Sequence, residues 1–154
     1  MLFLTSEQLE ILLKILLAVI LGGVVGLERE WKRKEAGLRT YMLVCLGSAI
    51  FTIVGLQSLE LYKNQANVLG FDPSRIVGQI VLGIGFLGSG IIIFRQEHVE
   101  GLTTAAGLWV TAAVGAAIGL GFYFISIFSS LLTLSILFFV RRVEKKIFGG
   151  KYTG

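Results

Sequence analysis

A neutral stretch of forty residues decides the fold class of this chain. Residues 101–140 read GLTTAAGLWVTAAVGAAIGLGFYFISIFSSLLTLSILFFV and contain no charged side chain. As a single helix this stretch would be about 60 Å long, twice the roughly 30 Å thickness of a bilayer's hydrocarbon core. We therefore expect two membrane-spanning helices joined by a tight turn. Glycine permits turn dihedrals and aromatic residues favour the interface, so we place the turn at Gly119, Gly121, Phe122 and Tyr123.

Three further apolar stretches precede this one, and each is about long enough to cross a bilayer. They are residues 9–27, 40–59 and 76–94. The first contains Glu10 and Lys14, and Lys14 lies near one end, where its stem can reach the interface. The expected fold is therefore all-α, a bundle of five transmembrane helices.

Composition leaves no room for a separate soluble domain. Charged residues make up 16% of the chain, whereas soluble domains carry about a quarter. We expect one transmembrane domain over residues 1–140 and a short basic cytoplasmic tail over residues 141–154. The lipid bilayer is then the main environment of the protein, and nucleic acid is not an expected partner.

The distribution of basic residues predicts the orientation of the bundle. With five spans, residues 28–39, 95–100 and 141–154 share one side and hold five, one and five basic residues. The opposite side holds Lys14, Lys63 and Arg75. The positive-inside rule then places the C-terminus in the cytoplasm and the N-terminus outside.

Glycines within the apolar stretches indicate closely packed membrane helices, because small residues let helix backbones approach each other. The glycines expected at helix contacts are Gly22, Gly26, Gly83, Gly85, Gly88 and Gly90. Together they offer more small-residue surface than one five-helix bundle needs. We therefore predict self-association as a homodimer.

Charged residues flank the connection between the first two spans. Glu28 and Arg29 follow the glycine face, and Arg39 directly precedes the second span. We interpret Arg29 as an ordinary interfacial charge. Glu28 fits an interfacial position and a position facing the bundle equally well. We predict that Glu28 pairs with Arg39, since pairing offsets part of the desolvation cost of both groups.

A second group of polar residues opens the third span. Asp72 as N-cap and Pro73 at the first helical position predict a helix start. Asp72, Arg75 and Gln79 are then spaced to share one face, and Gln79 enters the apolar stretch. We predict that these three form a functional polar cluster. The alternative is a capped helix with one amide that joins helices.

Catalytic chemistry has little support, so no catalytic residue is assigned and an enzyme is not expected. Cys45 lies in an apolar span without an evident base, and His98 is the only histidine. A hard cation such as Mg²⁺ remains an alternative, because glutamate and aspartate supply oxygen ligands. The expected topology separates Asp72 from the glutamates, so neither a cofactor nor a metal site is assigned.

Five motifs follow one another along the chain: GLER at 26–29, AGLRT at 36–40, DPSRI at 72–76, GIGFLGSG at 83–90 and GLTTAA at 101–106. On these motifs the chain resembles the MgtC/SapB family of bacterial inner-membrane proteins, over about residues 10–140. The resemblance implies a multi-pass protein of the plasma membrane linked to magnesium homeostasis or adaptation to low magnesium. In pathogens it implies a virulence-associated role in survival inside macrophages.

The resemblance also implies a regulator that binds membrane partners, the ATP synthase among them, rather than a magnesium pump. Longer family members add a soluble domain after the last helix, whereas only residues 141–154 follow here. The rival function is a cation channel or carrier, with Glu28, Arg39, Asp72, Arg75 and Gln79 along the path. Transport predicts a polar cavity lined by several spans, and regulation is compatible with a closed bundle with a glycine-rich outer face.

Overall fold

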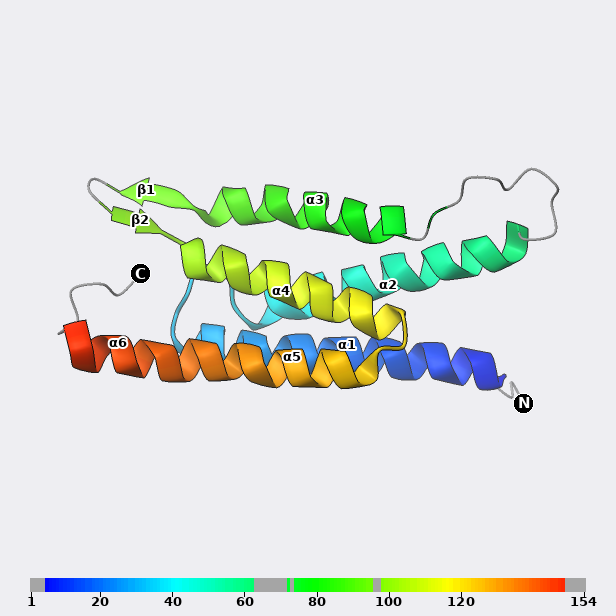
Figure 1. Ribbon diagram of the computed structural model, residues 1–154, viewed down its shortest axis with the longest axis horizontal. Coiled ribbons are helices and arrows are strands. Elements are labelled where there is room, and N and C mark those ends of the chain that lie inside the picture. Colours follow the sequence, from blue (N-terminus) through cyan, green and yellow to red (C-terminus); the bar gives the residue numbers. More distant parts are fainter. Residues whose placement is uncertain (1–4, 63–71, 73, 96–97, 149–154) are drawn as a thin grey trace.

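Five helices long and apolar enough to cross a membrane are present in the part of the chain that the structure describes. This structure is a computed structural model that describes residues 5–62, 72, 74–95 and 98–148 (Figure 1). The spans are α1 (Ser6–Trp31), α2 (Leu38–Tyr62), α3 (Ser74–Ile91), α4 (Leu102–Gly119) and α5 (Tyr123–Ser135) with its π-helical continuation η1 (Ile136–Val140). A last helix, α6 (Arg141–Phe148), continues from η1 into the tail. The prediction of five transmembrane helices is confirmed.

The neutral stretch breaks into two helices at the predicted turn. Gly121 has φ of +82°, a left-handed conformation that glycine adopts without the steric penalty of a Cβ. The Phe122 amide donates a hydrogen bond to the Ala117 carbonyl oxygen at 2.8 Å, which satisfies part of the exposed end of α4. The chain can therefore reverse within three residues at the membrane boundary.

The third span ends earlier than the sequence predicted, at Ile91 instead of residue 94. Strand β1 (Ile93–Arg95) pairs antiparallel with β2 (His98–Glu100), with Phe94 opposite Val99. The chain reverses direction between α3 and α4, and this hairpin makes the reversal. Gly101 then starts α4 with φ of +88°, and a Cβ there would collide with the Ile91 carbonyl oxygen.

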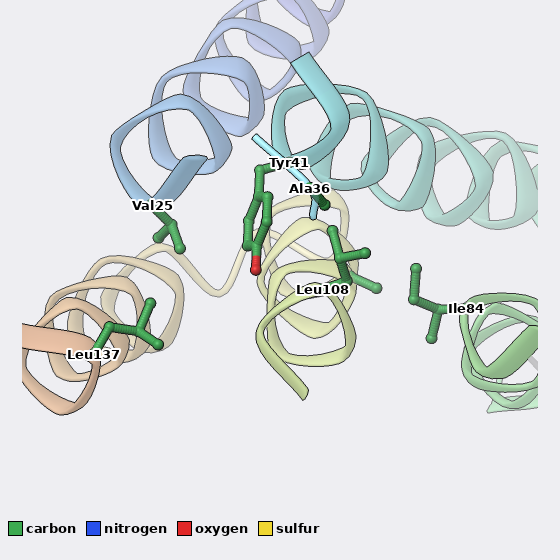
Figure 2. Close-up of a cluster of buried hydrophobic side chains, with 7 residues drawn as sticks. Val25, Ala36, Tyr41, Ile84, Leu108 and Leu137 are labelled. Atoms are coloured by element: carbon green, nitrogen blue, oxygen red, sulfur yellow. The ribbon is translucent and has the colours of Figure 1, made fainter. Parts of the chain in front are cut away.

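Helix α4 is the centre of the bundle and packs against each of the other four spans. Figure 1 shows α3 on one side of α4, with α1 and α5 on the opposite side. Figure 2 shows the buried side chains around Tyr41, which is fully buried and directs its hydroxyl toward α4. Tyr41, Val25, Leu108, Ile84 and Leu137 bring side chains from all five spans into this cluster.

The middle of the bundle is filled by close contacts between α1, α2 and α4. A Cβ at Gly22 of α1 would lie 2.7 Å from the Cβ of Cys45, nearer than real Cβ atoms approach. On α4, a Cβ at Gly115 would collide with the Cys45 carbonyl oxygen, and one at Gly119 would lie 2.6 Å from the Thr52 Cβ. These helices are therefore as close as their backbones allow.

The segments predicted to share a side lie at one end of the bundle. Figure 1 shows the β1–β2 hairpin, the α1–α2 connection and α6 at this end, and the α4–α5 turn at the other. This grouping is what five spans require. The assignment of the first end to the cytoplasm stays a prediction.

Candidate functional site

A buried arginine lies where α1 ends. The side chain of Arg29 is 3% exposed, and its Nη2 donates a hydrogen bond to Thr104 Oγ1 at 2.6 Å. Its Nη1 lies 3.6 Å from Glu28 Oε2. An isolated buried charge costs several kcal/mol, so these partners stabilise the guanidinium in its position. The bond to Thr104 also joins the last turn of α1 to the first turn of α4.

Thr104 connects Arg29 to two other segments. Its hydroxyl donates to Glu35 Oε2 at 2.5 Å, and Glu35 belongs to the α1–α2 connection. The Tyr41 hydroxyl of α2 donates to the Thr104 carbonyl oxygen at 3.2 Å. Four segments of the chain thus meet in one set of side chains. We call this set the Arg29 cluster: Glu28, Arg29, Glu35, Tyr41 and Thr104.

Glu35 is the outermost member of the Arg29 cluster. Partial burial by itself would raise the pKa of its carboxyl group. The hydrogen bond from Thr104, a backbone hydrogen bond and the charges of Lys34 and Arg29 outweigh burial, so the pKa of Glu35 lies below its usual value. Glu35 is therefore an anion at neutral pH and accepts the Thr104 hydrogen bond in that form.

Glu28 is the least satisfied member of the cluster. Its side chain is 10% exposed, and within the described residues neither carboxylate oxygen has a hydrogen-bond partner. Arg29 Nε likewise has none in that part of the chain. The Arg29 Nε–H group is a donor, and the two Glu28 oxygens beside it are acceptors. A small polar molecule such as water would bridge them.

The predicted pair of Glu28 with Arg39 is wrong. Glu28 has Arg29 as its ionic partner, no ion pair joins it to Arg39 in the described structure, and Arg39 is exposed. The reason is the rotation of α2. Leu38 and Tyr41 face Gly26 of α1, where a Cβ would lie within 3 Å of both residues, so Arg39 is left on the outer face.

The short α1–α2 connection is held by Glu30. Its Oε2 accepts a hydrogen bond from the Leu38 amide at 3.0 Å, so a carboxylate satisfies an amide at the N-terminus of α2. A Cβ at Gly37 would collide with this carboxylate. Glycine at this position therefore allows the connection to place Glu35 beside Thr104.

Asp72 caps α3, as its sequence context predicted. Its two carboxylate oxygens accept hydrogen bonds from the Ser74 amide at 2.9 Å and the Ser74 hydroxyl at 2.7 Å. These bonds hold the pKa of Asp72 below its usual value. The geometry matches the structural alternative for Asp72.

Arg75 and Gln79 lie instead on the wall of a groove between α2 and α3. The groove has a volume of about 980 Å³. Its polar lining residues are Thr40, Ser48, Ser58, Arg75 and Gln79, and apolar side chains such as Phe51 and Leu87 form much of the rest. Its lining residues Phe51 of α2 and Leu87 of α3 are exposed, so the groove opens on the lateral surface of the bundle.

The five polar residues predicted from the sequence do not meet in one place. Glu28 and Arg39 lie near the α1–α2 connection, whereas Asp72, Arg75 and Gln79 lie around the start of α3, at the other end of the bundle (Figure 1). Whether these residues are required for activity stays a prediction.

The glycines predicted at helix contacts divide into two groups. Gly22 and Gly26 pack α1 onto α2, and Gly88 of α3 faces Ala105 of α4, with 3.5 Å from its ideal Cβ to that of Ala105. For Gly83, Gly85 and Gly90, a Cβ would meet nothing within 4 Å in the described structure. Only the second group is open to another molecule, and the homodimer stays a prediction.

Sequence reasoning missed Arg29, Glu35, Tyr41 and Thr104. The sequence did contain a signal for Arg29, because its spacing places it on the same helical face as Gly22, Val25 and Gly26. All four residues are buried in the structure. The contact between Thr104 and Glu35 joins residues 69 positions apart. No local pattern specifies that contact.

The fold and these sites define a polytopic α-helical membrane protein with a buried charged cluster at one end and a lateral groove between two spans. The chain belongs to the MgtC family, whose family model matches residues 15–146. The resemblance noted in the sequence is thereby confirmed. No solved structure matches the chain.

Three relatives illustrate the match. The chain is 45% identical over 128 residues to the putative magnesium transporter YhiD of Escherichia coli K12, covering 83% of this chain and 59% of that protein. It is 38% identical to protein SapB of Bacillus subtilis, with coverage of 90% and 60%. It is also 38% identical to protein MgtC of Salmonella typhimurium, with coverage of 88% and 54%. The chain therefore spans little more than half the length of these relatives.

Proposed function

We propose that this protein regulates magnesium homeostasis or adaptation to low magnesium by binding another protein within the bacterial plasma membrane. The family and the names of its relatives link this membrane protein to magnesium. The observation that carries the mechanism is the lateral groove between α2 and α3, combined with a tightly packed centre. Binding from the side needs an accessible groove, whereas transport needs a path through the bundle.

The centre of the bundle supports this choice. Ala18, Cys45, Ala49, Val114 and Ile118 form an apolar cluster between α1, α2 and α4. The glycine contacts beside this cluster leave no space for even one added methyl group. An ion crossing here would lose its hydration without gaining polar ligands, which is costly.

The groove has the chemistry of a helix-binding surface in a membrane. Gly47 on α2 and Gly83 on α3 present open space where side chains would otherwise stand, and small residues of this kind admit a partner helix. Gln79 and Arg75 add polar groups near one end, where they can bond to a partner's polar side chains. A membrane protein such as the ATP synthase, or a second copy of this chain, fits such a surface.

Two glycines on α3 provide a matched test. Gly83→Leu places a side chain in the groove, whereas Gly85→Leu places the same side chain in open space on the same helix, away from the groove lining. The test strain lacks its own gene for this protein and carries the variant instead. We expect the strain with Gly83→Leu to fail to grow at low magnesium, and the strain with Gly85→Leu to grow. Both variants should accumulate normally in the membrane. Equal growth of the two variants would contradict partner binding at the groove.

Photo-crosslinking identifies the occupant. A benzophenone amino acid replaces Phe51, which lines the groove, or Phe124 on α5, which is exposed and outside it. We expect a crosslinked membrane protein from position 51 that disappears with Gly83→Leu and is absent from position 124. A product of twice the chain's mass would identify a second copy as the occupant. No product specific to position 51 would refute the proposal.

A second candidate function, a cation carrier, is favoured by one observation. The Glu28 carboxylate is buried beside Arg29, and among the described residues neither of its oxygens has a hydrogen-bond partner. A buried acid in a membrane protein commonly binds or relays a cation. Magnesium uptake by the purified protein in liposomes tests it. Uptake that Glu28→Gln abolishes would favour the carrier, and a lack of uptake would favour the regulator.

A further inference from the structure

The last helix of the chain carries a concentration of positive charge. The α6 sequence, RRVEKKIF, contains four basic residues and one acid. Arg142 and Lys146 are one helical turn apart and exposed, and so are Val143 and Ile147 on the adjoining face. The helix is therefore amphipathic, with a basic face and an apolar face side by side.

Helix length places this basic face at a defined depth. The span Tyr123–Val140 has 18 residues, which at about 1.5 Å each nearly equals the hydrocarbon thickness. Figure 1 shows α6 continuing in line with α5. Its eight residues add about 12 Å, and the headgroup region of one leaflet is roughly 6 Å thick. Arg142 then lies within the headgroup region, and Lys146 lies at its outer edge.

The side chain of Arg142 is turned back toward the membrane. Its guanidinium carbon lies 5.5 Å from the ring centre of Phe138, one turn earlier on η1. This cation–π contact holds the charge near the level at which lipid phosphates lie. α6 is the end of a transmembrane rod, so this depth cannot change without moving the whole span.

We propose that α6 is a binding site for anionic phospholipids, in which Arg142 and Lys146 contact the lipid phosphate and headgroup. Val143, which lies just beyond the end of the span, faces the acyl boundary of the same lipid. Charge complementarity identifies the occupant, because clustered basic residues directly following a span attract anionic headgroups. The site is separate from the groove and does not depend on the function proposed for it.

Native mass spectrometry of the full chain in mild detergent tests this proposal. The protein is titrated with dioctanoyl phosphatidylglycerol or with dioctanoyl phosphatidylcholine, which differ in headgroup charge. We expect wild-type protein to retain phosphatidylglycerol preferentially. Arg142→Gln with Lys146→Gln should weaken this retention by roughly tenfold or more, because each basic residue contributes about 1 kcal/mol. Phosphatidylcholine retention should not change.

The matched control removes the same charge at the same end of the bundle. Arg33 and Arg39 are both exposed and lie in and beside the α1–α2 connection, so Arg33→Gln with Arg39→Gln changes net charge equally. We expect this variant to retain phosphatidylglycerol as wild type does. Arg142→Lys with Lys146→Arg keeps both charges and should also bind.

Three outcomes would overturn the proposal. Equal losses in the two glutamine variants would mean a diffuse charge effect instead of a site on α6. Equal retention of the two lipids by wild-type protein would mean no headgroup selection. If the variant with Arg142→Gln and Lys146→Gln retained phosphatidylglycerol as wild type does, the basic face of α6 would not be a lipid site. It could then bind another ligand, such as an acidic protein segment.

Discussion

Arg29 and Thr104 are 75 residues apart in the sequence, and their side chains are joined by a hydrogen bond of 2.6 Å. This bond connects the end of α1 to the beginning of α4, which is the central helix of the bundle. Glu35 and Tyr41 reach the same threonine from the α1–α2 connection and from α2. These contacts join α1, α2 and α4 at one end of the bundle.

Removing the Thr104 hydroxyl should destabilise the protein. Thr104→Val leaves Arg29 and Glu35 each without one hydrogen bond, and a buried partner left unsatisfied costs about 1–3 kcal/mol. Thr103→Val is the control, because Thr103 is the neighbouring residue and is exposed. Thermal unfolding in detergent measures both variants. A melting temperature for Thr104→Val equal to that of Thr103→Val would show that the bond is energetically unimportant.

Glu28 should be energetically coupled to Arg29 and not to Arg39. Removing one member of a buried ion pair costs about 3–5 kcal/mol because the other charge is left uncompensated. Glu28→Gln and Arg29→Gln should therefore be strongly non-additive in a double-mutant cycle. The cycle of Glu28→Gln with Arg39→Gln should be additive. Coupling in the second cycle and additivity in the first would refute the observed pairing.

Lowering the pH should destabilise the protein, because protonation of Glu35 removes the stabilisation that its carboxylate provides. Its folded-state pKa is lowered, so the stabilisation is fully present above the unfolded value of about 4.3 and is lost as pH falls through the folded pKa. Glu35→Gln should flatten the fall of the melting temperature as the pH decreases below the unfolded-state pKa. An unchanged pH profile in this variant would mean that other carboxylates account for the acid sensitivity.

Two glycine substitutions should change stability in opposite directions. Gly22→Ala inserts a Cβ 2.7 Å from Cys45 and Tyr41 atoms, and overpacking of this kind costs about 1–3 kcal/mol. Gly85→Ala adds a methyl group in open space, where replacing a helical glycine gains up to about 1 kcal/mol. Unfolding by a denaturing detergent ranks the two variants against wild type. Equal stability would contradict the close contact between α1 and α2.

Substitutions at the start of α3 should separate capping from function. Asp72→Asn should leave stability and growth at low magnesium unchanged, because asparagine caps helices about as well as aspartate. Gln79→Leu should leave membrane accumulation unchanged but reduce growth, because it removes a polar group from the groove. If both variants grow normally at low magnesium, Asp72 and Gln79 are structural and the functional cluster does not exist.

The spans themselves followed from local properties of the sequence. The uncharged residues 101–140 required two helices, and Gly121 marked the turn between them. Asp72 identified the start of α3 by its capping chemistry. These features depend on helix length, hydrophobicity and backbone conformation, which neighbouring residues determine.

The end of α3 and the pairing of charges did not follow from local properties. Ile93 is as apolar as the span before it, yet it belongs to a hairpin because the chain must reverse before α4. Arg39 and Arg29 are both basic residues near helix ends in the sequence. The rotation of α2 on α1 leaves Arg39 exposed, whereas Arg29 is buried beside Thr104 of α4.

The sequence by itself therefore determined that this protein has five membrane-spanning helices, and its motifs indicated the family. Only the tertiary structure decided that Thr104 holds Arg29, that Glu28 faces Arg29, and that α2 and α3 leave a groove between them. Membrane insertion depends on the sum of apolar residues along each helix, which composition shows directly. A buried contact between polar side chains depends on the rotation and offset of helices far apart in sequence, which packing of the whole bundle sets.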